Sequence, residues 1–147
     1  MREDHPIFSG HSILIVEDEP LIALDVCEAL RGAGASVIAG TNVSDALRLI
    51  WQAEIAAAVV DIKLGADDCS RVCRALASRD IPFVFYTAYA AAPVLEEWPG
   101  VPVIAKPSST TNIVAAIEKL IARSPRAQIR DLAARVGAST LRAGPDR

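Results

Sequence analysis

Four apolar runs in this chain have the length and composition of β-strands that are buried on both faces. Patterns of spaced apolar residues that are typical of helices separate these runs. We expect strands at residues 12–17, 36–39, 56–61, 81–87 and 102–105. Strands that alternate with helices indicate an α/β fold with a doubly wound, five-stranded parallel sheet and helices on both faces. Connections in such sheets are right-handed, which leaves few topologies, and among these we expect the flavodoxin-like strand order 2-1-3-4-5.

Local signals place the ends of the helices. Pro20 lies near the start of the first helix, which should end at Gly32 and Gly34. Later helices should be capped by Ser44, by Asp67 or Asp68, and by Thr110 or Thr111. Residues 88–100 contain two prolines and a glycine, so we expect the fourth helix to be short or irregular.

The composition limits the class of protein. Hydrophobic residues make up 52% of the 147 residues and charged residues 22%, which excludes a disordered chain. The net charge of −3, without a long basic run, predicts no nucleic-acid binding. No apolar stretch reaches the roughly 18 residues that a membrane span needs. Residues 1–11 should be an N-terminal tail without a signal-peptide core, residues 12–123 one domain, and residues 124–147 a C-terminal tail or extra helix over 127–136.

The cysteines indicate the compartment. Cys27, Cys69 and Cys73 form an odd set without a disulfide framework, which is typical of a reducing compartment. We therefore expect a cytoplasmic protein in which these thiols pack as small hydrophobic side chains.

Polar side chains follow the apolar runs where each predicted strand ends. They are Glu17 and Asp18 after the first strand, Asp61 after the third, Thr87 at the end of the fourth and Lys106 after the fifth. Ligands of open parallel sheets bind at the carboxyl ends of the strands, so these side chains should share one pocket. Each residue alone also has a structural interpretation: Asp18 as a helix N-cap, Lys106 as part of a turn, and Thr87 as a strand end.

The combined set of side chains suits phosphoryl chemistry. Glu17, Asp18 and Asp61, with the backbone carbonyl of Lys63, would form a hard oxygen site for Mg²⁺. Asp61 is the expected nucleophile, which would form an acyl phosphate. Lys106 supplies a positive charge for a phosphoryl oxygen, and Thr87 supplies a hydroxyl donor.

Four motifs resemble those of the receiver domains of two-component response regulators, over about residues 11–123. They are ILIVEDEP, AAAVVDIKL, FVFYTAY and VIAKP. The resemblance implies that Asp61 accepts a phosphoryl group from a histidine kinase or phosphotransfer protein in a Mg²⁺-dependent reaction. It also implies that Thr87 is a switch hydroxyl, and that the bond between Lys106 and Pro107 is cis. The only catalysis implied is that of the domain's own phosphorylation and dephosphorylation, so the chain is not expected to be an enzyme.

Some positions depart from the family pattern. Val103 stands where typical members carry an aromatic switch residue, and Gly65-Ala66 stands where Pro-Gly is usual. The fourth strand is similar to a subgroup with a Phe-Ala-Thr-Gly-Tyr-like motif, whose members often stand alone and pair with HWE-type histidine kinases. The resemblance thus implies no effector domain, a conformational signal to an unidentified downstream protein, and leaves a homodimer open.

Three other functions compete with this interpretation. A haloacid-dehalogenase-like phosphohydrolase needs a second Asp two residues after the first, where this chain has Lys63. A nucleotide-binding flavodoxin-like module would need a phosphate loop after the first strand, where Glu17 and Asp18 would repel phosphate. A phosphorylation-independent pseudo-receiver, acting as a protein–protein interaction module, stays open, and a phosphorylation assay separates it from the main hypothesis.

Overall fold

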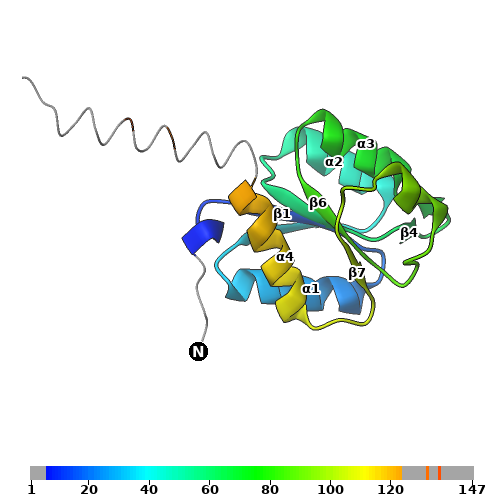
Figure 1. Cartoon of the computed structure of the whole chain (residues 1–147), viewed down its shortest axis with the longest axis horizontal. Coiled ribbons are helices and arrows are strands. Elements are labelled where there is room, and N and C mark those ends of the chain that lie inside the picture. Colours follow the sequence, from blue (N-terminus) through cyan, green and yellow to red (C-terminus); the bar gives the residue numbers. More distant parts are fainter. Residues whose placement is uncertain (1–5, 124–131, 133–135, 137–147) are drawn as a thin grey trace, which may run out of the picture.

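The computed structural model describes residues 6–123, 132 and 136, and it contains a five-stranded parallel sheet between two helical layers (Figure 1). The sheet runs in the order β2-β1-β3-β6-β7, and every neighbouring pair of strands is parallel. Counted along the chain, these are the five predicted strands in the order 2-1-3-4-5, so the flavodoxin-like fold is confirmed. The strands are β1 (Ser12–Val16), β2 (Ser36–Gly40), β3 (Ala57–Val60), β6 (Phe83–Thr87) and β7 (Val103–Ala105).

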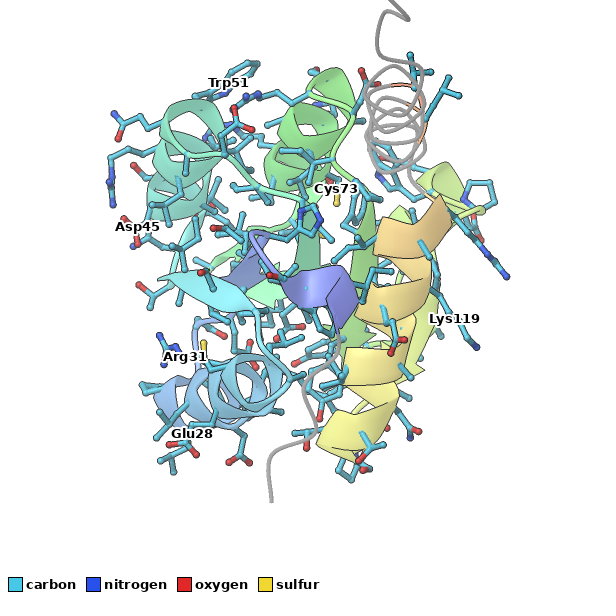
Figure 2. All side chains as sticks on the ribbon, turned by 90° about the vertical axis from the view of Figure 1, so that its left-hand side faces the viewer. Glu28, Arg31, Asp45, Trp51, Cys73 and Lys119 are labelled. Carbon is cyan, nitrogen blue, oxygen red and sulfur yellow. The ribbon has the colours of Figure 1, made fainter. Side chains whose placement is uncertain are left out.

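Helices cover both faces of the sheet (Figures 1 and 2). One face packs against α1 (Pro20–Gly32) and α4 (Thr110–Arg123), and the other against α2 (Val43–Gln52) and α3 (Ser70–Ser78). Alternate residues of β1 therefore enter different cores: Leu14 lies in the α2–α3 core and Ile15 in the α1–α4 core. All three cysteines are buried in these two cores as free thiols, as expected.

The capping residues of α2 and α4 differ from those predicted. The side chain of Asn42, rather than Ser44, caps α2 by accepting a 2.8 Å hydrogen bond from the backbone N–H of Asp45. At the start of α4 the hydroxyl of Ser109 accepts a 3.2 Å bond from the N–H of Thr111. At each helix the sequence alone did not distinguish the residue that caps from the one predicted, because neighbouring polar residues have similar capping propensities.

A short antiparallel hairpin follows the third sheet strand and was not predicted. It pairs β4 (Lys63–Leu64) with β5 (Asp67–Asp68). Asp68 accepts a 2.9 Å hydrogen bond from the N–H of Ser70, but the N-cap position of α3 is Cys69, whose side chain makes no capping bond. The expected cap by Asp67 or Asp68 is therefore wrong in position.

The segment between β6 and β7 lacks a full α-helix, as the prolines predicted. It contains only the 3₁₀ helix η2 (Pro93–Glu97). Trp98, which follows it, packs edge-on against Phe83 with a centroid distance of 5.6 Å. The segment is thus fastened to the α2–α3 core although its backbone is irregular.

The packed part of the chain begins before residue 12. Residues Pro6–Phe8 form the 3₁₀ helix η1, and Phe8 is completely buried in the α1–α4 core. The N–H of His11 donates a 3.0 Å bond to the carbonyl of Phe8. The helix predicted over residues 127–136 lies outside the described residues except at 132 and 136. No helix in the described part of the chain combines the length and the apolar character of a bilayer-spanning segment.

Candidate functional site

Parallel pairing aligns the carboxyl ends of the three central strands. Val16 of β1 is in register with Val60 of β3, which is in register with Phe85 of β6. The N–H of Asp61 donates a 3.0 Å bond to the carbonyl of Val16, and this bond extends the pairing by one residue. The side chains that follow β1 and β3 therefore emerge side by side at one edge of the sheet.

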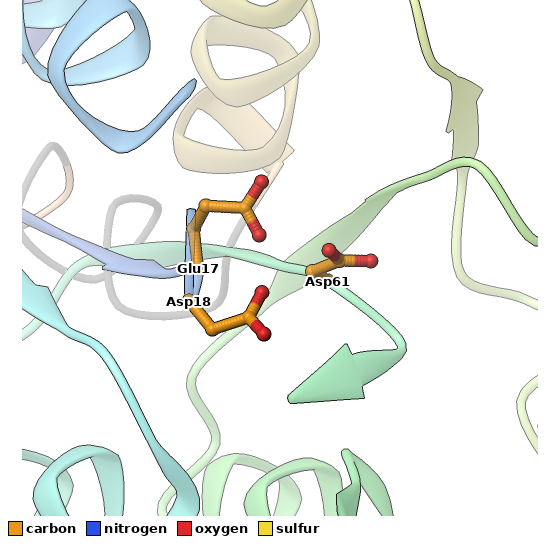
Figure 3. A group of neighbouring side chains, drawn as sticks. All are labelled: Glu17, Asp18 and Asp61. Carbon is orange, nitrogen blue, oxygen red and sulfur yellow. The ribbon is translucent and has the colours of Figure 1, made fainter. Parts of the chain in front are cut away.

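Three carboxylates converge there (Figure 3). Glu17, Asp18 and Asp61 each offer an oxygen, and these oxygens all lie within 4.8 Å of one another. Glu17 is only 4% exposed and Asp61 7%, whereas Asp18 is less buried. Three negative groups in such a confined space repel one another, so the site requires positive charge.

Lys106 brings one positive charge into the cluster. Its Nζ atom donates a 2.9 Å hydrogen bond to Oδ2 of Asp61 and another to Oε1 of Glu17. The ammonium also lies 5.5 Å from the ring centroid of Tyr86. The N–H of Lys106 donates a 2.9 Å bond to the carbonyl of Thr87, which continues the pairing of β6 with β7. The peptide bond to Pro107 is cis, as the family resemblance implied.

The surroundings shift the pKa values of the two buried carboxyl groups, Glu17 and Asp61, in opposite directions. Burial, reinforced by the nearby Asp61, raises the pKa of Glu17 to about 7 despite the opposing effect of Lys106. Burial also acts to raise the pKa of Asp61, but Glu17, Lys106 and the Thr87 hydroxyl outweigh it and hold that pKa below its ordinary value. Burial opposes the charge of Lys106, yet the two carboxylates raise its pKa overall. Asp61 is therefore ionised at neutral pH.

Two buried carboxylate oxygens remain without a partner. Oε2 of Glu17 and Oδ1 of Asp61 make no hydrogen bond to any residue that the structure describes. Leaving a buried charged oxygen unsatisfied is costly, so either a proton or a cation should occupy this position. A set of carboxylate oxygens in one cleft is the kind of donor that Mg²⁺ prefers. The residues therefore fit a magnesium ion.

Asp18 fastens the hairpin to the site. Its Oδ2 atom accepts a 2.9 Å hydrogen bond from the N–H of Gly65, 47 residues further along the chain. Gly65 has a φ of +63°, a conformation that favours glycine. The N-cap position of α1 is Glu19, without a side-chain capping bond, so the structural interpretation of Asp18 as a cap is wrong.

Thr87 completes the strand ends. Its side chain is fully buried, and Oγ1 accepts a 3.0 Å hydrogen bond from the N–H of Tyr89. A cleft of about 280 Å³ opens beside it. That cleft is lined by Asp18, Glu19, Ile22, Asp61, Lys63, Ala88, Tyr89 and Lys106.

The structure brings together most of the predicted site. Glu17, Asp18, Asp61 and Lys106 form one cluster, and Lys63 lines the cleft beside them. Ile22 and Ala88 were missed, because an apolar lining residue carries no chemical signal in the sequence. Val103, at the position where an aromatic residue was expected from the resemblance, is 42% exposed on β7.

Comparison with known proteins agrees with this arrangement. The family model of the response regulator receiver domain matches residues 13–118 of this chain. The phyllosphere-induced regulator PhyR of Methylorubrum extorquens is 32% identical over 114 residues, a match that covers 74% of this chain and 43% of the relative. The chain thus spans less than half of that curated protein.

Solved receiver structures share the fold. The receiver domain of PhyR from Erythrobacter litoralis superposes with a TM-score of 0.71 at 22% identity, covering 80% of this chain and 94% of that one. A CheY-like receiver protein from Methanospirillum hungatei gives 0.68 at 26% identity, with coverages of 75% and 93%. The receiver domain of a sensor histidine kinase from Pseudomonas aeruginosa gives 0.68 at 24% identity, with coverages of 77% and 98%, and holds a magnesium ion in its active-site cleft.

Proposed function

Because this chain belongs to the response regulator receiver domain family, we propose that it accepts a phosphoryl group on Asp61 and signals the event to a partner protein. The phosphodonor is either a histidine kinase or a phosphotransfer protein, and the motif of the fourth strand points to a kinase of the HWE type. The donor, the downstream protein and this chain are all cytoplasmic in this proposal. The domain is a signalling module whose chemistry is confined to its own aspartate.

One observation carries the proposal. Asp61 is a buried carboxylate with one oxygen bonded to the Lys106 ammonium and the other without a partner among the described residues. Its pKa is held below the ordinary value, so the group is a carboxylate and not a carboxylic acid at neutral pH. A positioned carboxylate beside a fixed cation is a competent nucleophile toward phosphorus.

The reaction uses the groups at the strand ends. An oxygen of Asp61 attacks the phosphorus of a phosphohistidine, the new P–O bond forms as the P–N bond breaks, and the imidazole leaves and takes up a proton. Lys106 attracts a phosphoryl oxygen during the transfer. Thr87 offers its hydroxyl proton to another phosphoryl oxygen. A Mg²⁺ ion held by Glu17, Asp18, Asp61 and the backbone carbonyl of Lys63 would neutralise charge that develops on the phosphoryl group.

The bond between Thr87 and the next segment supplies a route for the signal. The Thr87 hydroxyl accepts from the N–H of Tyr89, so a hydroxyl that turns toward a phosphoryl group alters the anchoring of residues 88–100. That segment leads directly into β7, which pairs with β6, and α4 also contacts β6. We therefore place the surface read by the downstream protein there.

The test is covalent labelling. Wild-type protein is incubated with a small acyl phosphate donor and Mg²⁺, and the intact mass is measured. We expect one added phosphoryl group on the wild type and on Asp25→Asn, an exposed carboxylate outside the cleft, and none on a folded Asp61→Asn variant. Equal labelling of Asp61→Asn would remove Asp61 from the role.

The exposed Val103 favours a second candidate, a pseudo-receiver that binds partners without phosphorylation. Without an aromatic side chain at this position, one element of the usual switch is missing. A folded wild-type protein that takes no label from either acyl phosphates or a phosphorylated kinase would support this alternative.

A further inference from the structure

Tyr86 is a buried side chain with a polar tip that the proposed phosphoryl transfer does not use. It lies on β6, directly before Thr87, and enters the α1–α4 core, where the residue is only 9% exposed. Its hydroxyl faces the backbone of Ser108, with both the N–H and the carbonyl of that residue at 3.4 Å. Both distances are long for hydrogen bonds, so the hydroxyl alone contributes little. The contact nevertheless places the tyrosine against the loop that begins at Lys106.

The ring of Tyr86 contacts the Lys106 ammonium. The Nζ atom of Lys106 lies 5.5 Å from the ring centroid, which is within the distance of a cation–π interaction. The lysine side chain is only 13% exposed, so little water competes with the ring for the cation. A cation–π interaction is stronger when the cation has lost its water. The ring is therefore a substantial part of the surroundings of this ammonium.

Lys106 needs support from outside its own strand. It follows β7, a three-residue strand at the edge of the sheet in which no residue is buried. A lysine side chain is a long, flexible stem, so fixing its ammonium costs conformational entropy. The neighbouring strand β6 is buried along its whole length. A side chain from β6 is therefore better placed to fix the ammonium than one from β7.

The ring attracts the ammonium without using any of its hydrogen-bond donors. Oxygens of Glu17 and Asp61 accept two of the three N–H donors of Lys106 within the described part of the chain. An aromatic face attracts a cation through its quadrupole and takes up no lone-pair direction of its own. The third donor thus stays available for a phosphoryl oxygen, which a hydrogen-bonding side chain at position 86 would prevent.

A small internal cavity shows what the ring excludes. Its volume is about 10 Å³, room for one water molecule at most, and it is lined by Tyr86 together with Glu17 and Asp61. Its other lining residues are apolar: Ile15, Val16, Ile22, Val26 and Val59. A smaller side chain at position 86 would enlarge this space beside the Lys106 ammonium, which could then move away from Asp61.

We propose that Tyr86 is a positioning residue for phosphoryl transfer, and that its ring holds the Lys106 ammonium where the phosphoryl oxygen arrives. The inference rests on the proposed phosphorylation of Asp61. Tyr86 acts through Lys106 and touches neither the donor nor the acceptor oxygen. The hydroxyl serves only to orient the ring against the Ser108 backbone.

The experiment measures the rate of loading. Tyr86→Leu and Tyr86→Phe are incubated with a small acyl phosphate donor at saturating Mg²⁺, and the added mass is followed over time. In this reaction an Asp61 oxygen bonds to phosphorus, the acyl P–O bond of the donor breaks, and the donor leaves as a carboxylate. We expect Tyr86→Leu to load about five- to thirtyfold more slowly, the range that corresponds to a desolvated cation–π contact. Tyr86→Phe, which keeps the ring, should load within about twofold of the wild type.

Two further measurements separate positioning from general damage. The Mg²⁺ site depends on carboxylates and not on Tyr86, so Tyr86→Leu should bind Mg²⁺ at least as tightly as the wild type in calorimetric titration. Damage to the sheet edge would instead weaken Mg²⁺ binding and slow loading together. The ring current should also shift the side-chain proton resonances of Lys106 in the wild type and in Tyr86→Phe, and Tyr86→Leu should lose that shift.

Phe85→Leu is the matched control. Phe85 is the adjacent residue of β6, is fully buried, and enters the α2–α3 core on the opposite face of the sheet. Loss of its ring should lower the Tm about as much as Tyr86→Leu does and leave loading within about twofold of the wild type. If Tyr86→Leu does not fold, Tyr86→Met replaces it with the same expectation, because methionine fills irregular space without a ring.

Three results would overturn the role of the ring while leaving phosphorylation of Asp61 intact. They are loading of the ring-less variant at the wild-type rate, equal slowing by Phe85→Leu, and slowing by Tyr86→Phe as large as that by Tyr86→Leu. A wild-type protein that takes no label would instead refute the proposed function itself, and this inference with it.

Discussion

Lys106 donates a 2.9 Å hydrogen bond from Nζ to Oδ2 of Asp61, although 45 residues separate the two along the chain. Only one side of the carboxylate is neutralised in this way, because Oδ1 has no partner among the described residues. The same asymmetry recurs at Glu17, where Lys106 contacts Oε1 and Oε2 is unpaired in the described part of the chain. These two oxygens, Oε2 of Glu17 and Oδ1 of Asp61, determine how the site responds to cations and protons.

Magnesium should stabilise the folded protein. An ion that binds only the folded state at 100 times its Kd adds about 2.7 kcal/mol, which corresponds to a rise of several degrees in Tm. We expect this rise in differential scanning calorimetry with millimolar MgCl₂, and not with NaCl at matched ionic strength. Asp18→Asn and Asp61→Asn should lose most of the rise, whereas Glu28→Gln, an exposed residue of α1, should retain it. An equal rise in all four proteins would exclude the cluster as the binding site.

The raised pKa of Glu17 should make the metal-free protein less stable as the pH rises. The folded state keeps this proton up to a pKa of about 7, whereas the unfolded state releases it near 4.5. Between these values the folded state binds more protons, so the stabilisation present below about pH 4.5 is lost as the pH approaches and passes 7. We expect the Glu17 contribution to fall by roughly 1–3 kcal/mol between pH 5 and 8 in urea unfolding with a chelator.

Glu17→Gln isolates this contribution from those of the other titrating groups. Asp61, with its lowered pKa, acts in the opposite sense, since its stabilisation is lost only as the pH falls below about its ordinary value of 3.8. The difference in unfolding free energy between wild type and Glu17→Gln should therefore change across pH 5–8, and Mg²⁺ should reduce that change. A difference that is independent of pH would refute the assignment.

A phosphoryl mimic should alter hydrogen exchange after β6. The amide of Tyr89 is bonded to the Thr87 hydroxyl, which a phosphoryl group would engage. We expect altered exchange at Tyr89, through residues 88–100 and in β7 and α4, measured with beryllofluoride and Mg²⁺. The Asp61→Asn variant treated identically should show no such change. Exchange that stays the same in the wild type would remove this surface from the signalling route.

Phe8 should contribute to stability although it lies in a segment expected to be a tail. Its side chain is fully buried in the α1–α4 core. Truncation of a buried phenylalanine costs about 3–5 kcal/mol, so Phe8→Ala should lower the unfolding free energy by about 3 kcal/mol. Leu21→Ala, at a position 78% exposed, should change it by less than about 0.5 kcal/mol. A loss below 1 kcal/mol for Phe8→Ala would mean that η1 is not part of the core.

The sheet and the cluster were predictable from sequence for the same reason. Buried parallel strands are continuous apolar runs, and the polar residue after such a run lies at the functional edge of the sheet. Asp61 after Val60 and Lys106 after Ala105 are examples, and both lie in the cluster that the structure shows. The sequence pattern is local, but the contact that it predicts, between Asp61 and Lys106, joins residues far apart along the chain.

Other features depend on the path of the backbone. Asn42 caps α2 because its φ and ψ are extended there, which a sequence with Asn42 and Ser44 so close together does not reveal. The hairpin of Lys63–Leu64 and Asp67–Asp68 is too short to have a period. Phe8 was missed because Ile7 and Phe8 form an apolar pair that is too short to show a period, and its burial depends on the packing of α4 against η1.

The bond between Asp18 and Gly65 gives the site a built-in spectroscopic reporter. The carboxylate of Asp18, one of the three carboxylates proposed to hold the metal, also accepts a hydrogen bond from a glycine amide, and glycine amides resonate in a sparsely populated region of a proton–nitrogen correlation spectrum. Movement of that single peak during a titration would follow metal arrival without a label, a dye or an added chromophore. The tip of the hairpin is thus a natural place from which to observe chemistry occurring at the sheet edge.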